Sequence, residues 1–187
     1  MDYYLDVKIL PDAEFCQNYF MNVLGSRLHL FLVANKELSI GMSFPGYSLA
    51  PKTLGDVLRL HGSLMDLEQL AGSQCLKAMS DYVEYDGVAG CPATDKYVDV
   101  RRVQAKSSPH RLARRYAKRH GLSFAEALEK YKKLSSERVK YPFFSLNSQS
   151  TGQHFYLFIR QSVPHSNETS GDFNSFGLSK TASLPWF

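Results

Sequence analysis

Apolar and polar residues alternate over residues 3–10, a pattern typical of a half-buried strand, and Asp12 then offers a helix N-cap. From Phe15 to Leu32 the apolar residues recur at intervals of three and four, so we expect one long helix that ends near Asn35. Ser63 begins a capping pattern that predicts a second helix. Short strands are expected at 40–44, 57–61 and 82–88. The order strand, helix, strand, strand, helix, strand predicts a ferredoxin-like domain.

A second domain is expected after residues 92–96, where Pro92 coincides with a change in charge balance. We therefore predict domains at 1–95 and 96–187. Residues 97–103 again have the pattern of a strand.

Strong end signals surround the next predicted helix, which covers about residues 109–120. Ser108 suits the N-cap, Pro109 the first helical position and Gly121 the C-terminal cap. Ser123 with Glu126 opens another helix directly afterwards. Strands then follow at 143–147 and 155–159. The predicted fold class is therefore α+β, and the second domain along the chain is a smaller α/β domain.

The charges are distributed unevenly between the two halves of the chain. Residues 1–100 contain 7 Lys and Arg against 13 Asp and Glu, a net charge of −6, whereas residues 101–187 contain 15 against 5, a net charge of +10. A local surplus of this size favours binding to the phosphates of a nucleic acid, because bound cations release condensed counterions. The alternative is a basic surface that only contacts solvent.

The predicted helix at 109–120 carries five cations at offsets of 0, 3, 4, 7 and 8, and no acidic residue lies between 101 and 120. Like charges at these spacings repel one another, and an anionic partner would offset this repulsion. An arginine-rich helix can enter the major groove of an RNA helix near its end and contact phosphates on both walls. The five cations are Arg111, Arg114, Arg115, Lys118 and Arg119.

Other candidate residues lie outside that helix. Arg102 and Gln104 alternate with Val103 and can project from one side of a strand, where Arg pairs with guanine and Gln with adenine. His29 occupies the flank of the first helix, a position typical of a partly buried residue as well as of a catalytic base. Three further candidates surround a polar, glycine-containing turn. They are the hydroxyls of Ser148 and Ser150 and the ring of Phe155, which can stack on a base.

The sequence also suggests what the protein lacks. Its three cysteines are widely spaced and indicate neither a disulfide framework nor a zinc site, so we expect no metal and no other cofactor. No apolar run approaches the length of about 20 residues that spans a bilayer, and no secretory pattern opens the chain. We therefore expect a cytoplasmic protein without a membrane partner.

Taken together, these segments resemble the CRISPR repeat-RNA processing endoribonuclease of subtype I-F systems along the whole chain. The likeness rests on His29, on the basic helix and on several short segments, which are Met1-Asp2, Tyr4-Leu5-Asp6, Ser43-Phe44-Pro45, Arg102-Val103-Gln104-Ala105-Lys106-Ser107, Ser148-Gln149-Ser150-Thr151-Gly152-Gln153-His154-Phe155, Gly177-Leu178-Ser179-Lys180 and Pro185-Trp186-Phe187.

The resemblance implies a ferredoxin-like (RAMP-type) first domain and a second domain whose arginine-rich helix enters the major groove of the repeat hairpin. It implies that Arg102 and Gln104 read bases near the bottom of the stem and that Phe155 stacks on the terminal base pair. His29 and Ser148 would flank the scissile phosphate. The expected reaction is metal-independent: the RNA 2′-hydroxyl attacks at the 3′ base of the hairpin and leaves a 2′,3′-cyclic phosphate or a related end.

The expected partners are the CRISPR repeat RNA stem-loop, which the enzyme retains after cleavage, and the other protein subunits of the type I-F surveillance complex. Two positions depart from the pattern: Phe176 stands where a tyrosine is expected beside His29, and Lys118 replaces an arginine. A hairpin-binding structural subunit that cuts weakly or not at all is therefore the alternative, and a general RNA-binding protein is a more distant one.

Overall fold

The computed structural model describes residues 1–104, 109–131, 140–148 and 151–187. These residues form two compact units, one made of Met1–Val103 with Tyr141–Phe187 and the other of Gln104–Lys140. The helices are α1 (Gln17–Ala34), α2 (Leu64–Ala71), α3 (Gln74–Lys77), α4 (Pro109–His120) and α5 (Phe124–Tyr131). The strands are β1 (Tyr3–Ile9), β2 (Gly41–Ser43), β3 (Ser48–Leu49), β4 (Lys52–Thr53), β5 (Val57–Gly62), β6 (Val83–Glu84), β7 (Ala89–Gly90), β8 (Tyr97–Val98), β9 (Val100–Val103), β10 (Phe143–Asn147), β11 (His154–Gln161) and β12 (Leu184–Pro185).

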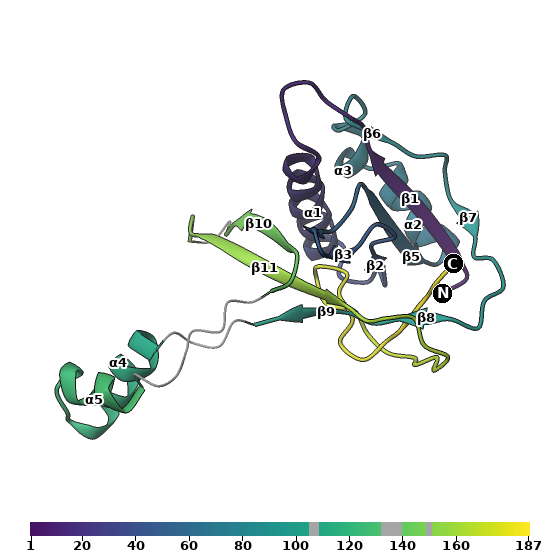
Figure 1. Ribbon diagram of the computed structural model, residues 1–187. Helices are drawn as coiled ribbons and strands as arrows, with labels where there is room; N and C mark the ends of the chain where they lie inside the picture. Colours follow the sequence, from purple (N-terminus) through teal and green to yellow (C-terminus); the bar gives the residue numbers. More distant parts are fainter. Residues whose placement is uncertain (105–108, 132–139, 149–150) are drawn as a thin grey trace. The chain divides into compact units, whose positions relative to one another are not determined.

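The main sheet of the first unit has the strand order β2-β5-β1-β6, and β7 pairs with the start of β1. The strand pairs within the described residues are antiparallel, and helices and sheets are mixed along the chain, which agrees with the α+β prediction. Leu5, Val7 and Ile9 of β1 are fully buried on the sheet face that α1 and α2 cover (Figure 1). This face holds the main hydrophobic core.

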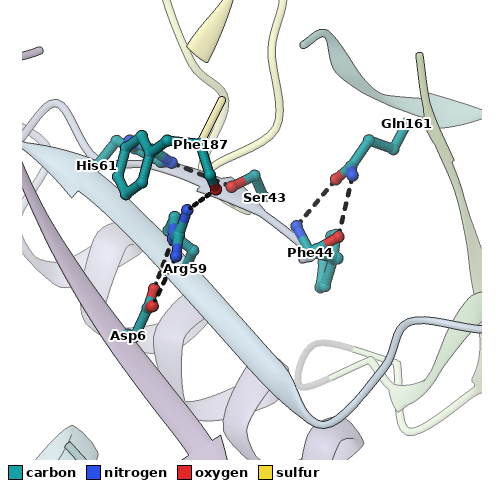
Figure 2. A network of polar contacts seen from close by, with 7 residues as sticks. All are labelled: Asp6, Ser43, Phe44, Arg59, His61, Gln161 and Phe187. Atoms are coloured by element: carbon teal, nitrogen blue, oxygen red, sulfur yellow. Dashed lines mark hydrogen bonds and ion pairs between the residues drawn. The ribbon is translucent and has the colours of Figure 1, made fainter. Parts of the chain in front are cut away.

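The C-terminal segment covers the opposite face of the main sheet, as Figure 2 shows at close range. Arg59 donates to both carboxylate oxygens of Asp6 at 2.7 and 2.8 Å and to the main-chain oxygen of Phe187 at 2.7 Å. Its guanidinium also lies 4.1 Å from the centre of the Phe187 ring. The paired charge and the ring contact fix the end of the chain against β5.

A second sheet, in the order β10-β11-β9, packs through one face onto α1. Phe144 of β10 is fully buried, and a Cβ added at Gly25 of α1 would lie 2.6 Å from its ring, so the glycine permits the close approach of helix and strand. The side-chain amide of Gln161 bonds the main-chain N–H and C=O of Phe44 at 2.9 and 3.0 Å (Figure 2). These contacts join the second sheet to the edge of the first.

The second unit contains α4 and α5. Gly121 adopts φ +64° after α4, a left-handed conformation that favours glycine at a helix end. Ser123 and Glu126 form a reciprocal capping box, because the Glu126 carboxylate accepts from the Ser123 N–H at 2.9 Å and the Ser123 hydroxyl accepts from the Glu126 N–H at 3.3 Å. Ala113 of α4 and Ala127 of α5 are fully buried where the two helices meet.

Two local predictions were wrong. The first helix begins at Gln17 rather than after Asp12, because the Asp12 carboxylate accepts from the N–H groups of Glu14 and Phe15, both at 2.8 Å, and closes a turn instead. The strand predicted at 82–88 is reduced to β6, since Gly87 with φ +102° turns the chain. Ser108 lies outside the described residues.

No described helix has the length and apolar character that crossing a membrane would require.

The domain boundary predicted at residue 95 was based on Pro92, on the change in charge balance and on the strand pattern that follows, and it stays a prediction. The segment that separates from the rest is Gln104–Lys140, which includes α4. Strands β9, β10 and β11 stay with the first unit.

Candidate functional site

His29 is half-buried on α1 and is held by the C-terminal segment. Its Nδ1 lies 2.8 Å from the main-chain oxygen of Ser175. A carbonyl oxygen only accepts hydrogen bonds, so Nδ1 must be the donor and carries the proton. In the neutral imidazole the lone pair is then on Nε2, which is the nitrogen that can take a proton from a substrate.

Phe176 stacks on the His29 imidazole, with ring centres 3.7 Å apart and an interplanar angle of 2°. The stack limits rotation of the imidazole ring about χ2, and the bond to Ser175 fixes which nitrogen faces the main chain. Together the two contacts orient the imidazole without a side-chain hydroxyl.

A tight turn presents Ser175 and Phe176 to α1. The Asn174 side chain accepts from the N–H groups of Phe176 at 2.8 Å and Leu178 at 3.2 Å. Gly177 has φ +68°, and its carbonyl accepts from the Met42 N–H of β2 at 2.8 Å. A side chain at Gly177 would strain the backbone and displace the turn that holds His29.

Ser148 directly follows β10, the strand that packs on α1. Its N–H donates to the Gln153 carbonyl at 2.9 Å and its carbonyl accepts from the Gly152 N–H at 2.8 Å, which closes the turn between β10 and β11. The Ser148 hydroxyl accepts from the Thr151 N–H at 3.3 Å. Ser148 and His29 are thus supplied by adjoining elements of one unit. Ser150 lies outside the described residues.

The other predicted RNA contacts occupy different surroundings. Phe155 is half-buried and packs against the core, on the face of β11 that also carries Leu157 and Ile159. Arg102 is exposed on β9, opposite Ile159. Gln104 is exposed and belongs to the second unit.

All five predicted cations of α4 are exposed, namely Arg111, Arg114, Arg115, Lys118 and Arg119. Helix α4 spans the same residues for which the sequence predicts a helix. Its other side packs on α5 through Ala113, and Tyr116 accepts a hydrogen bond from Lys130 of α5 at 3.0 Å. Helix α5 therefore packs against the side of α4 that carries Ala113 and leaves the five cations accessible to a polyanion.

A second Ser and His pair lies in the main sheet. The Ser43 hydroxyl is 3.0 Å from Nε2 of His61, and both residues are fully buried (Figure 2). Burial lowers the pKa of His61 to about 3, with a further contribution from the nearby Arg59 charge. His61 is therefore neutral near pH 7 and cannot reach a substrate.

The sequence prediction missed a groove of about 460 Å³ between α1 and the β10–β11 hairpin. Tyr19, Asn22 and Ser26 line it from α1, and Ser145 and His154 line it from the hairpin, with the Ser145 hydroxyl 2.7 Å from Nε2 of His154. The α1 residues recur at intervals of three and four and lead on to His29, a signal that the sequence does contain. Within the described parts of the chain, no cluster of three or more His, Cys, Asp or Glu residues is arranged to hold a metal ion.

Comparisons with known proteins agree along the whole chain. The family described as "CRISPR-associated protein (Cas_Csy4)" matches residues 4–187. The chain is 42% identical to a CRISPR-associated endonuclease Cas6/Csy4 of Pseudomonas aeruginosa (strain UCBPP-PA14), over 187 residues that cover 100% of both chains. It is 39% identical to a CRISPR-associated endonuclease Cas6/Csy4 of Escherichia coli (strain UTI89 / UPEC), again over 100% of both.

Proposed function

Since the chain belongs to the Cas6/Csy4 family of CRISPR-associated endonucleases, we propose that it cleaves CRISPR repeat precursor RNA at the 3′ base of the repeat hairpin and so produces guide RNA. The observation that carries this proposal is the geometry of His29. Its Nδ1 donates to the Ser175 carbonyl at 2.8 Å, which leaves the Nε2 lone pair for a proton from the RNA.

The cleavage step needs no group beyond the RNA and these side chains. The 2′-hydroxyl gives its proton to Nε2 of His29, its oxygen bonds to the adjacent phosphorus, and the bond from phosphorus to the 5′-oxygen breaks. The leaving 5′-oxygen takes up a proton, which the protonated Nε2 of His29 can return, and a 2′,3′-cyclic phosphate remains. Ser148 would hold the attacking nucleotide in line, which its position at the end of β10 beside α1 supports.

Binding of the RNA would depend mainly on the second unit, Gln104–Lys140, which contains α4. We propose that the α4 cations enter the major groove of the hairpin, while Arg102 and Gln104 read bases near the bottom of the stem and Ser150 and Phe155 contact the RNA near the cut. The strand order β2-β5-β1-β6 supports a ferredoxin-like topology for the first domain. The product would stay bound, as part of a type I-F surveillance complex in the cytoplasm.

The test mixes the purified protein with its repeat hairpin in EDTA, beside a hairpin with a 2′-deoxy nucleotide before the cut. Cleavage of the first RNA alone is the expected result, because only that RNA contains the nucleophile and no metal is available. Tight binding without cleavage of either RNA would instead indicate a hairpin-binding structural subunit. Cleavage that EDTA abolishes would contradict the metal-independent mechanism.

A further inference from the structure

The groove between α1 and the β10–β11 hairpin lies on the two elements that supply His29 and lead into Ser148. Its volume of about 460 Å³ is within the range of sites that hold a small ligand such as a nucleotide. We propose that this groove and the aromatic row beyond it bind the single-stranded RNA that flanks the hairpin. The inference rests on the proposed function and extends it from the paired stem to the unpaired flank.

The groove offers the groups that a nucleotide requires. Asn22 uses its Oδ1 to accept from the Ser145 N–H at 2.8 Å, so its Nδ2 donors are the part that can meet a base. The guanidinium of Arg27 is fixed at one wall by the carbonyls of Cys75 at 3.0 Å and Gln74 at 2.7 Å. A cation held in this way can attract a phosphate with little further loss of side-chain entropy.

An aromatic row continues from the groove over the solvent face of the second sheet. His154 lines the groove, and its ring centre is 5.0 Å from that of Tyr156. Tyr156 lies 4.6 Å from Phe143, which in turn lies 5.5 Å from Phe158. Tyr156 and Phe143 are 51% and 42% exposed, whereas Phe144, Leu157 and Ile159 on the other face of the sheet are fully buried, so large rings are displayed to solvent on one face only.

The charges along this track favour RNA as the occupant. Neither α1 nor residues 140–167 contain an aspartate or glutamate, although the first 100 residues carry a net charge of −6. Arg160 of β11 and its cross-strand partner Arg101 of β9 lie on the same sheet face, beyond the aromatic row, and Arg101 is itself paired with the Asp99 carboxylate at 3.3 Å. Exposed aromatic rings with cations beside them bind unpaired bases by stacking, as on other sheet surfaces that bind single strands.

The experiment measures the affinity of the protein for hairpins that carry the 2′-deoxy block and therefore remain uncut. One hairpin has no flank, one has a 5′ single-stranded flank and one a 3′ flank. We expect one flank to tighten binding by about tenfold, equivalent to one well-stacked base. The double variant Phe143→Ala/Tyr156→Ala should remove that gain and leave the affinity for the bare hairpin unchanged.

Two matched variants control for general effects. Tyr82→Ala removes a tyrosine that is 40% exposed but lies outside the groove and the row, and should retain the gain. Tyr156→Phe keeps the stacking ring and should also retain it. An unchanged affinity for the hairpin without a flank shows that each variant is folded.

The two proposals fail in different ways in this experiment. If the bare hairpin binds but neither flank adds affinity, the inference is overturned and the aromatic row is left as a surface for a protein subunit. If the bare hairpin does not bind at all, the proposed function fails, and the flank offered as a free oligonucleotide still decides whether the groove holds RNA.

Discussion

His29 and His61 lie in the same compact unit, but their surroundings differ in exposure and in the partners of their ring nitrogens. His61 is buried beside the Ser43 hydroxyl, and burial holds its pKa at about 3. His29 is half-buried on a helix flank, donates to a main-chain carbonyl and stacks on Phe176. Of the two histidines, His29 is therefore the one whose second ring nitrogen can take a proton from a substrate, as the proposed function requires.

The largest expected effect follows from the His29 side of this comparison. His29→Ala should lower the rate of hairpin cleavage by roughly 10²- to 10⁴-fold, the usual contribution of a general base. Hairpin affinity should stay within about twofold, because the α4 cations that would supply most of it are unchanged. Single-turnover cleavage and equilibrium binding of the 2′-deoxy hairpin measure the two quantities.

His61→Gln is the matched control, because it changes the other histidine of the comparison. Its cleavage rate per folded molecule should remain close to that of the wild type. If the two variants lost cleavage equally, the difference in role between the two histidines would be refuted.

The next effect concerns the network that surrounds His61. Arg59→Met should lower the free energy of unfolding by about 3 kcal/mol, because it removes a largely buried guanidinium and leaves Asp6, the partner in its ion pair, without that contact. Denaturant unfolding measures this loss, and Arg101→Met is the control because the Arg101 side chain is 51% exposed whereas that of Arg59 is 11% exposed. Equal losses for the two variants would mean that the contacts of Arg59 with Asp6 and Phe187 add no more stability than those of the more exposed Arg101.

More of the regular elements than of the geometry of the site could be predicted from the sequence. The capping residues Ser63 and Ser123 and the glycine at 121 act locally, so their helices could be located from a few neighbouring positions. Helix α1 began later than expected, since nothing in the pattern shows that the Asp12 carboxylate closes a turn with Glu14 and Phe15.

The contacts that orient His29 depend on residues far along the chain. Ser175 lies 146 positions from His29, and its contribution is a main-chain carbonyl that no side-chain pattern reveals. The Arg59 contact with Phe187 likewise joins β5 to the end of the chain, at a separation of 128 residues. Periodicity and capping report only local structure, so the resemblance to a family and the three-dimensional structure were both needed to describe the site.

The dependence of the free energy of unfolding on pH tests whether burial keeps His61 neutral. The folded pKa of about 3 lies below the unfolded value of about 6.5, so between these values the unfolded chain binds one proton more than the folded protein. The contribution of His61 is therefore fully present above about pH 6.5 and is lost as the pH falls, at up to about 1.4 kcal/mol per pH unit.

The His61→Gln variant should lack this dependence. The difference in unfolding free energy between wild type and variant, measured in denaturant at several pH values, should be constant above pH 7 and shrink towards acid. A difference that stays constant down to pH 4 would show that His61 is not kept neutral by burial.

The smallest expected effect tests whether Phe176 acts through His29. Phe176→Ala should slow cleavage by roughly 2- to 10-fold, since an aromatic stack contributes about 0.5–1.5 kcal/mol, and Phe176→Tyr should keep the stack and the rate. In the His29→Ala background the same truncation should have almost no further effect, because there is no imidazole left to orient. A full loss in that background would mean that Phe176 contacts the RNA directly instead of orienting the imidazole.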